Sequence, residues 1–331
     1  MKTIYLYLFS LIVFLIFPIK AQESNDFFDP MDVFELEWAS DPQVSPDSKT
    51  IVYVRKSHDI MKDEVRSNIW QIKIDGEDHR PLYSELGDSY SPRWSPNQDR
   101  LAFLSNNSES TQIHMYWFKS GETRAITQLP ESPSSLSWSP DGKWIAFTMN
   151  VKTKSNAIVE SREKPDGANW AKKPITVTTT RYQYDGRGIV EPSYRHIFVV
   201  PAEGGSARQL TTGNFNHYGS LSWSPDSESI FFSAHRSDDW ELASSEADIH
   251  SVKITDESID QITDQSGEES SPIVSPNGKL VAFNLRERRP LAYTPNRIAV
   301  MDLEGKNIRV ISGDLDGDAE NIVWAEDNQS I

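Results

Sequence analysis

Five segments of the chain share one pattern of hydrophobic and polar positions. Each has an apolar or Trp residue, then Ser-Pro, then Asp or Asn, a short polar turn and an apolar run. The copies are VSPDSKTIVY from Val44, WSPNQDRLAF from Trp94, WSPDGKWIAF from Trp138, WSPDSESIFF from Trp223 and VSPNGKLVAF from Val274. Pro fixes φ near −65° and Asp-Gly or Asp-Ser tolerates a tight reversal, so each copy predicts a β-hairpin.

A second hairpin pattern lies between successive copies. It reads NIWQIKIDGEDHRPLY from Asn68, QIHMYWFKSGETRAIT from Gln112, HIFVVPAEGGSARQLT from His196, DIHSVKITDESIDQIT from Asp248 and RIAVMDLEGKNIRVIS from Arg297. Two hairpins make four strands, and four-stranded units that recur about every 45–50 residues are typical of propeller blades. A β-sandwich or barrel is the alternative, and five copies in one register argue against it.

The sequence therefore predicts an all-β fold: a β-propeller of four-stranded blades over residues 22–331, with five complete blades. A sixth copy, WAEDNQSI, begins at Trp324, and we expect it to be a truncated blade in an incomplete domain. The Trp residues that open most copies are interpreted as packing between neighbouring blades.

The first 21 residues have the pattern of a secretory signal peptide. Lys2 is followed by an apolar run from Ile4 to Ile19 and a small residue, Ala21, after which cleavage is predicted. An uncleaved anchor is the alternative, but the run is short and is broken by Pro18. We expect an exported, periplasmic protein that has no membrane association after cleavage.

The composition argues against several kinds of partner and binding site. The formal charge of −16 argues against nucleic acid as a partner, because phosphates recruit Lys and Arg. The chain has no Cys, which excludes disulfides and thiolate metal sites. Its seven His are scattered without zinc-site spacing, so we predict no cofactor and no metal.

An acidic loop at residues 313–320 invites a calcium hypothesis. Asp314, Asp316, Asp318 and Glu320 alternate along it. An EF-hand needs Gly and Glu where this loop places Ala319 and Ala325, so a solvated loop is the favoured interpretation.

The insertion at residues 151–194, predicted to lie in the third blade, differs in composition from its surroundings. Its aromatic residues include Trp170, and its basic residues are Lys152, Lys154, Arg162, Lys164, Lys172, Lys173, Arg181 and Arg187. Arg181, Tyr182 and Tyr184 are the candidates for substrate contact, since Arg binds carboxylates and Tyr donates hydrogen bonds. The favoured alternative is an ordinary extended hairpin that packs on the neighbouring blade.

Two stretches are more specific than the repeat. The insertion contains TRYQYDG from Thr180, and RSDDWEL begins at Arg236. With the repeats, they resemble the propellers of exported dipeptidyl-peptidases and acylaminoacyl-peptidases of the prolyl oligopeptidase family. For Arg236–Trp240, a pore-lining role and a blade-tip turn both stay open.

The resemblance implies a propeller that limits access to an α/β-hydrolase domain with a Ser, Asp and His triad, the Ser lying in Gly-x-Ser-x-Gly. No such motif occurs here. The nearest stretch, Gly204–Arg208, lacks the last Gly, and Ser206 is interpreted as a turn residue. We predict no catalytic residue in this chain and expect it to be inactive alone.

The sequence favours the non-catalytic propeller of an exported serine peptidase that acts on short peptides. A stand-alone periplasmic interaction protein like the TolB propeller is the alternative, and a propeller fused to another hydrolase is a third. The sequence alone predicts no oligomeric state.

Overall fold

The computed structural model describes residues 27–83, 87–106, 110–153, 162–171, 176–177, 179–186, 188–190, 192–242, 246–289, 293–325, 327–328 and 330–331. The predicted signal peptide, residues 1–21, lies outside them. Apart from one 3-10 helix, η1 (Pro30–Glu35), every regular element of the described residues is a β-strand. The all-β prediction is therefore confirmed.

Five antiparallel sheets of four strands follow one another along the chain. The first contains β1 (Glu37–Val44), β2 (Thr50–Asp59), β3 (Glu64–Lys73) and β4 (Arg80–Tyr83). The second contains β5 (Ser89–Trp94), β6 (Arg100–Ser105), β7 (Gln112–Trp117) and β8 (Thr123–Ala125). The third contains β9 (Pro133–Trp138), β10 (Trp144–Lys152), β13 (Ser193–Pro201) and β14 (Arg208–Gln209).

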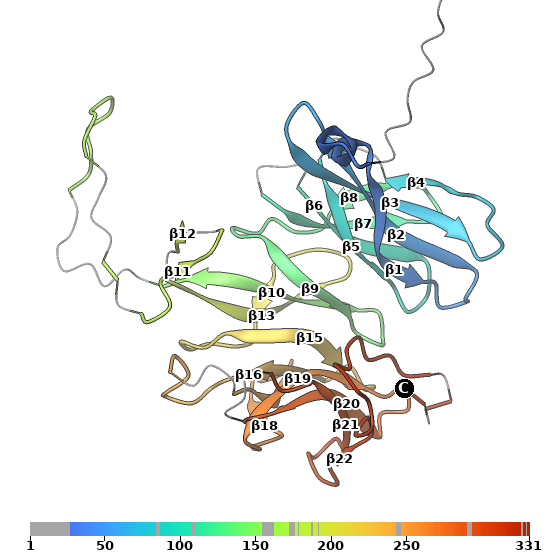
Figure 1. Ribbon diagram of the computed structural model, residues 1–331, viewed down its shortest axis with the longest axis vertical. Coiled ribbons are helices and arrows are strands. Elements are labelled where there is room, and N and C mark those ends of the chain that lie inside the picture. The colour runs from blue at the N-terminus through green and yellow to red at the C-terminus, as the bar shows by residue number, and fades with distance from the viewer. Residues whose placement is uncertain are drawn as a thin grey trace, which may run out of the picture.

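The fourth sheet contains β15 (His217–Trp223), β16 (Ser229–Ala234), β17 (Asp248–Lys253) and β18 (Ile259–Gln261). The fifth contains β19 (Gly267–Val274), β20 (Leu280–Glu287), β21 (Arg297–Asp302) and β22 (Arg309–Val310). A small hairpin, β11 (Gln183–Tyr184) and β12 (Gly188–Ile189), lies in the insertion between β10 and β13. The sheets succeed one another around an arc, from the first in blue to the fifth in orange and red (Figure 1).

The Ser-Pro repeat forms the turn between the first two strands of each sheet. In the first sheet, Ser45 Oγ contacts Asp47 Oδ1 at 2.7 Å and accepts a hydrogen bond from Thr50 N at 2.9 Å. The residue after Asp or Asn has positive φ in every copy: Ser48, Gln98, Gly142, Ser227 and Gly278. The sixth copy forms a similar turn, in which Ala325 N donates to Ser330 O at 2.9 Å.

The first strands of the sheets lie on the inside of the arc, where each contacts the first strand of the next sheet. Each contains a β-bulge at a residue with positive φ. These residues are Asp41, Ser91, Ser135, Gly219 and Ser271. A bulge bends a strand and redirects its side chains. The inner strands of all five sheets line a central cavity of about 640 Å³.

Indole groups connect the second, third and fourth sheets and the sixth repeat to the sheet that precedes each of them. Trp94 Nε1 donates to Gln43 O at 3.1 Å, and Trp138 Nε1 donates to Arg93 O at 3.0 Å. The other two bonds run from Trp223 to Ser137 O at 3.2 Å and from Trp324 to Ile273 O at 2.9 Å. The Trp residues pack between sheets as predicted, and these four bonds, here called the indole ladder, add a directional contact.

The apolar core is divided into four clusters, each between two neighbouring sheets. Alternate residues of one strand serve different clusters: Phe231 packs towards the fifth sheet and Phe232 towards the third. This follows from the two-residue period of a strand, because both faces of each inner sheet are covered. The fully buried Phe103, Phe147, Phe232 and Phe283 occupy one position of the repeat.

Candidate functional site

Two of the three predicted contact residues, Arg181 and Tyr184, line one pocket of about 390 Å³ beside the third and fourth sheets. Tyr182 does not line it and is 41% exposed. Its main chain instead closes the β11–β12 hairpin, because Val190 N donates to Tyr182 O at 3.0 Å. Of the other basic residues of the insertion, Lys154, Lys172, Lys173 and Arg187 lie outside the described residues.

The rest of the pocket wall comes from the start of β13 and β15 and from a turn after β16. Tyr194 and Arg195 begin β13, and Tyr218 lies in β15. Trp240 meets Tyr194 edge to face, with ring centroids 5.9 Å apart and planes at 78°. The sequence analysis did not single out Tyr194, Arg195 or Tyr218, and it left a pore-lining role open for the stretch that contains Trp240. Their signal in the sequence is weak, because they are distributed over three segments.

The two stretches that carried the family resemblance meet at this pocket. Thr180 precedes Arg181, and both its main-chain N and its hydroxyl donate to Glu241 Oε2, at 2.9 and 2.8 Å. Glu241 follows Trp240 in RSDDWEL. A carboxylate that accepts two hydrogen bonds from one residue holds the insertion hairpin against the fourth sheet.

The pocket combines positive charge with aromatic surface. Among the described residues, no carboxylate lies within ion-pair distance of the Arg181 or Arg195 guanidinium. Burial raises the pKa of Tyr218, and Arg181 opposes that rise. Burial and nearby Glu241 raise the pKa of Tyr194. Both phenols therefore stay protonated at neutral pH and can donate hydrogen bonds.

Beneath the pocket, His217 is fixed in one tautomer. Its Nδ1 lies 2.6 Å from Arg195 O and its Nε2 lies 2.9 Å from Arg236 Nη1. Because a guanidinium only donates, Nε2 accepts and Nδ1 carries the proton. Burial, the largest cause, lowers the pKa of His217 to about 3, and the ring is neutral. Arg236 directly precedes the turn of residues 237–242, and its guanidinium donates back to His217 in β15.

Neighbouring His196 and His250 are buried in the same region. Burial and the charge of Arg236 lower the pKa of each to about 4. His196 Nδ1 lies 3.3 Å from the Thr211 hydroxyl, and Nδ1 of His250 lies 3.1 Å from Asp248 O. These rings pack the strands that support the pocket, and each is a neutral structural group.

Two other sequence hypotheses fall on described residues. Ser206 lies in the connection from β13 to β14, where Gly204 and Gly205 both have positive φ, so it is part of a hairpin turn. In the acidic loop, Arg297 Nη1 donates to Leu315 O at 2.5 Å and Gly317 O at 3.1 Å. The described residues contain no group of three His, Cys, Asp or Glu arranged to hold a metal. They also contain no helix long and apolar enough to cross a bilayer.

Comparison with known proteins gives a family and several relatives. The TolB beta propeller domain family matches residues 48–328. The uncharacterized peptidase YuxL of Bacillus subtilis is 30% identical over 205 residues, 62% of this chain and 30% of that protein. Dipeptidyl-peptidase 5 of Porphyromonas gingivalis is 23% identical over 95% of this chain and 47% of its own length. The chain thus spans less than half the length of these two relatives.

A solved structure has the same architecture. The acylaminoacyl peptidase in complex with Z-Gly-Gly-Phe-chloromethyl ketone matches with a TM-score of 0.66 and 14% sequence identity. The match covers 87% of this chain and 41% of that one. At this level of identity the likeness concerns the fold, and it agrees with the arc of four-stranded sheets.

Proposed function

Because this chain belongs to the TolB beta propeller domain family, we propose that it is the non-catalytic propeller of an exported serine peptidase that cleaves short peptides. The peptidase is of the dipeptidyl- or acylaminoacyl-peptidase type. The propeller gates the access of peptides to a hydrolase domain outside the present sequence. That domain supplies the Ser nucleophile and its His and Asp for acyl transfer.

One observation carries the proposal: the TRYQYDG and RSDDWEL stretches converge on one pocket. They are separated by about fifty residues, yet Thr180 bonds to Glu241, and Arg181 and Trp240 line the same wall. The match to dipeptidyl-peptidase 5 extends across both stretches. A binding site built from separate segments is typical of loops positioned by a rigid scaffold.

The chemistry of the pocket suits one end of a short peptide. Arg181 and Arg195 offer charge-assisted hydrogen bonds to a carboxylate. The rings of Tyr194 and Trp240 offer flat surface to an apolar side chain. Gating is supported separately by the central cavity, which the bulged inner strands line. Peptides small enough to pass that cavity would reach the hydrolase domain, and folded proteins would not.

The test is peptide binding to the purified chain, measured by fluorescence anisotropy with labelled dipeptides and tripeptides. We expect Arg181→Ala to weaken binding about tenfold, because a charge-assisted hydrogen bond is lost. Tyr184→Phe should weaken binding by a smaller factor through loss of one hydroxyl.

Tyr182→Phe is the matched control, because Tyr182 belongs to the same segment but lies outside the pocket. It should bind peptides as the unmodified chain does. Equal peptide binding by Arg181→Ala and Tyr182→Phe would contradict the proposal that peptides bind in this pocket.

Export is part of the same proposal. The apolar run from Ile4 to Ile19 is its support, since a basic start and Ala21 frame it as a signal peptide. Amino-terminal sequencing of the protein recovered from a periplasmic fraction should begin at Gln22. Recovery of an intact Met1 from the membrane fraction would instead favour an uncleaved anchor.

A stand-alone interaction propeller is the second candidate, and the TolB description of the matched family favours it. It predicts a protein partner and no dependence on Arg181. Size-exclusion chromatography of cross-linked periplasmic complexes, compared between the unmodified chain and Arg181→Ala, separates the two candidates.

A further inference from the structure

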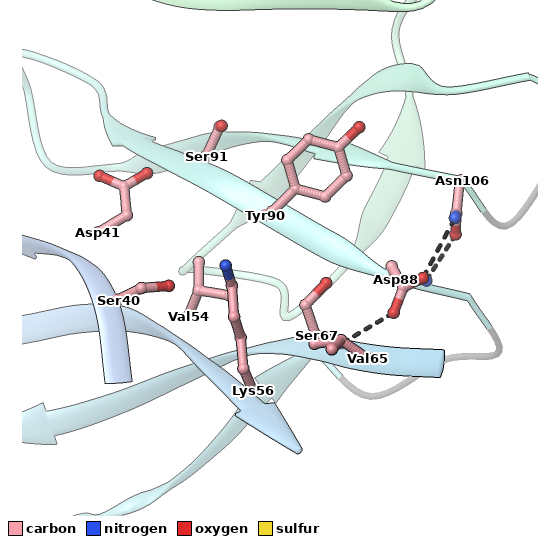
Figure 2. A pocket seen from close by; sticks show the side chains of 10 residues that line it. All are labelled: Ser40, Asp41, Val54, Lys56, Val65, Ser67, Asp88, Tyr90, Ser91 and Asn106. Carbon is pink, nitrogen blue, oxygen red and sulfur yellow. Dashed lines mark hydrogen bonds between the residues drawn. The ribbon is translucent and has the colours of Figure 1, made fainter. Parts of the chain in front are cut away.

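A second pocket, of about 370 Å³, lies at the joint between the first and second sheets. Figure 2 shows that β1, β2, β3 and β5 each contribute side chains to it. It is well separated along the chain from the pocket at Arg181. The ligand that this pocket can bind depends on which of its charged groups already have partners.

Both carboxylates of this pocket are occupied. Asp41 accepts hydrogen bonds from Arg93 Nη1 at 3.0 and 2.9 Å and from Gln43 Nε2 at 2.8 Å. Asp88 accepts from Ser67 N at 2.8 Å and from Asn106 Nδ2 at 3.3 Å, and Arg66 Nε lies 3.7 Å away. These groups hold the two sheets together and have little capacity for another cation.

The charge of Lys56, in contrast to those of Asp41 and Asp88, is not paired with another charged group of the described residues. Lys56 is half-buried, and among the described residues no carboxylate lies within ion-pair distance of its ammonium. Figure 2 shows its side chain rising from β2 towards β5, between Ser40 and Ser67. A half-buried ammonium that is not engaged by a carboxylate of the protein can pair with an anionic ligand.

The other repeats have different residues at the position of Lys56. This position lies twelve residues after the first residue of each copy, and Asn106, Asn150, His235 and Arg286 hold it in the other sheets. Arg286 is opposite Glu268 across the strands and forms an ion pair with it at 2.7 Å. Lys56 is opposite Trp38, which provides no negative charge.

The remaining polar groups of the pocket are hydroxyls. Ser40, Ser67 and Ser91 line it, and Tyr90 adds a phenol whose oxygen is 3.5 Å from the Thr111 hydroxyl. Val54 and Val65 supply apolar wall. Figure 2 shows Lys56 between Ser40 and Ser67, and an ammonium with hydroxyl donors beside it is the complement of a single carboxylate group.

We propose that this pocket binds the carboxylate of a small ligand, with the Lys56 ammonium as its counterion. A carboxylate fits better than a phosphate dianion, because the second negative charge would lie beside Asp41 and Asp88. The carboxylate belongs either to the carboxyl end of a short peptide or to a small organic acid. The site does not depend on the function proposed above.

The experiment is isothermal titration calorimetry of the full chain, in a buffer without carboxylates, with three probes: N-acetyl-glycylglycine, its carboxamide and acetate. We expect the peptide acid to bind and the carboxamide to bind at least about tenfold more weakly, since only the acid pairs with Lys56. Acetate binding as tightly as the peptide acid would assign the site to small organic acids.

Variants separate this pocket from the one at Arg181. Lys56→Gln should lose about tenfold in affinity for the acid, and Lys56→Arg should retain binding because it keeps the charge. Lys62→Gln is the matched control, because Lys62 is exposed in the loop that follows the same strand. Each titration is repeated in the Arg181→Ala background, where the acid binding that remains should still depend on Lys56.

Equal affinity of acid and carboxamide for the unmodified chain would overturn the proposal. Equal binding by folded Lys56→Gln and Lys62→Gln would overturn it as well. Should Lys56→Gln fail to fold, the acid–carboxamide difference and its retention in Lys56→Arg decide the matter.

Discussion

The carboxyl group of Glu269 lies in β19 with no exposed surface, beside a group of other acids. Burial, the largest cause, raises its pKa to about 7, and Asp248, Asp264 and Glu246 add to the rise while Thr263 opposes it. Burial and Glu246 likewise raise the pKa of Asp248 to about 6. At the joint between the fourth and fifth sheets, the folded protein therefore keeps Glu269 and Asp248 protonated at pH values where the unfolded chain would release those protons.

The sign of the pH effect follows from that rise. The ordinary pKa of Glu269 is near 4.5, so folding takes up a proton between about pH 4.5 and 7. Stability from this group is full below pH 4.5 and is lost as the pH rises through 7. The three buried His work in the opposite direction, since their lowered pKa values cost stability as the pH falls below 6.5.

Glu269→Gln should therefore raise the free energy of unfolding more at pH 8 than at pH 5. Each pKa unit corresponds to about 1.4 kcal/mol, so the gain has an upper limit of about 3 kcal/mol. Urea unfolding at both pH values measures it, and the His contributions cancel because both proteins contain them.

Glu268→Gln is the control, because that neighbouring carboxylate is paired with Arg286. It should lack the gain at pH 8. A Glu269→Gln effect of the same size at pH 5 and pH 8 would contradict the assignment of the proton to this side chain.

At the same scale, sequence reasoning singled out Arg181, Tyr182 and Tyr184, and the structure brings Arg181 and Tyr184 to one pocket without Tyr182. Residue type identified the basic, aromatic segment, and only the path of the β11–β12 hairpin decides which of its side chains face the pocket. Tyr194 and Tyr218 were missed because folding brings them together from separate strands. Lys56 was missed because its lack of a counterion depends on Trp38 across the sheet.

At the scale of the elements, the sequence predicted the strands and the turns between them, but it did not predict the β-bulges. Ser-Pro-Asp fixes the turn by local chemistry. Asp41, Ser91, Ser135 and Ser271 have positive φ with no Gly to announce it. Their conformation is imposed by closure of the inner strands around the cavity, which no short stretch of sequence encodes.

Gly219 is the one glycine among the five bulge residues, and its neighbours explain why. A Cβ there would lie 3.3 Å from Ser271 N on the neighbouring inner strand. Gly121 has the same φ, +72°, and open space around it. Gly219→Ala should thus cost about 1 kcal/mol more than Gly121→Ala, because both pay the backbone strain and only one adds a close contact.

Thermal unfolding of the two variants measures this difference directly. Similar losses of stability would mean that the two inner strands move apart at little cost. They would also imply that the central cavity is more compliant than its bulges indicate.

At the scale of the whole molecule, the repeat was sufficient to predict a propeller because every copy makes the same local choices. The core is distributed over four joints, so stability depends on contacts between neighbouring sheets. The site is harder to predict than the fold, since it lies where the copies differ. The insertion and Lys56 are both departures from the repeat.

A prediction for the intact chain concerns chemistry. The sequence contains no Gly-x-Ser-x-Gly, and Ser206 is held in a hairpin turn. We expect no hydrolysis of fluorogenic dipeptidyl or acyl-aminoacyl substrates and no labelling by a fluorophosphonate, with an active serine peptidase as the positive control. Labelled, probe-inhibited turnover would reveal a nucleophile and contradict the proposed division of labour.

The indole ladder has a consequence for synthesis on the ribosome. Each Trp reaches back to a carbonyl of the preceding sheet, as Trp138 does to Arg93 and Trp324 to Ile273. A newly emerged repeat that opens with Trp therefore finds its acceptor already displayed on a finished neighbour. Growth in this direction lets each sheet serve as the template for the next, so a nascent chain can gain order one repeat at a time.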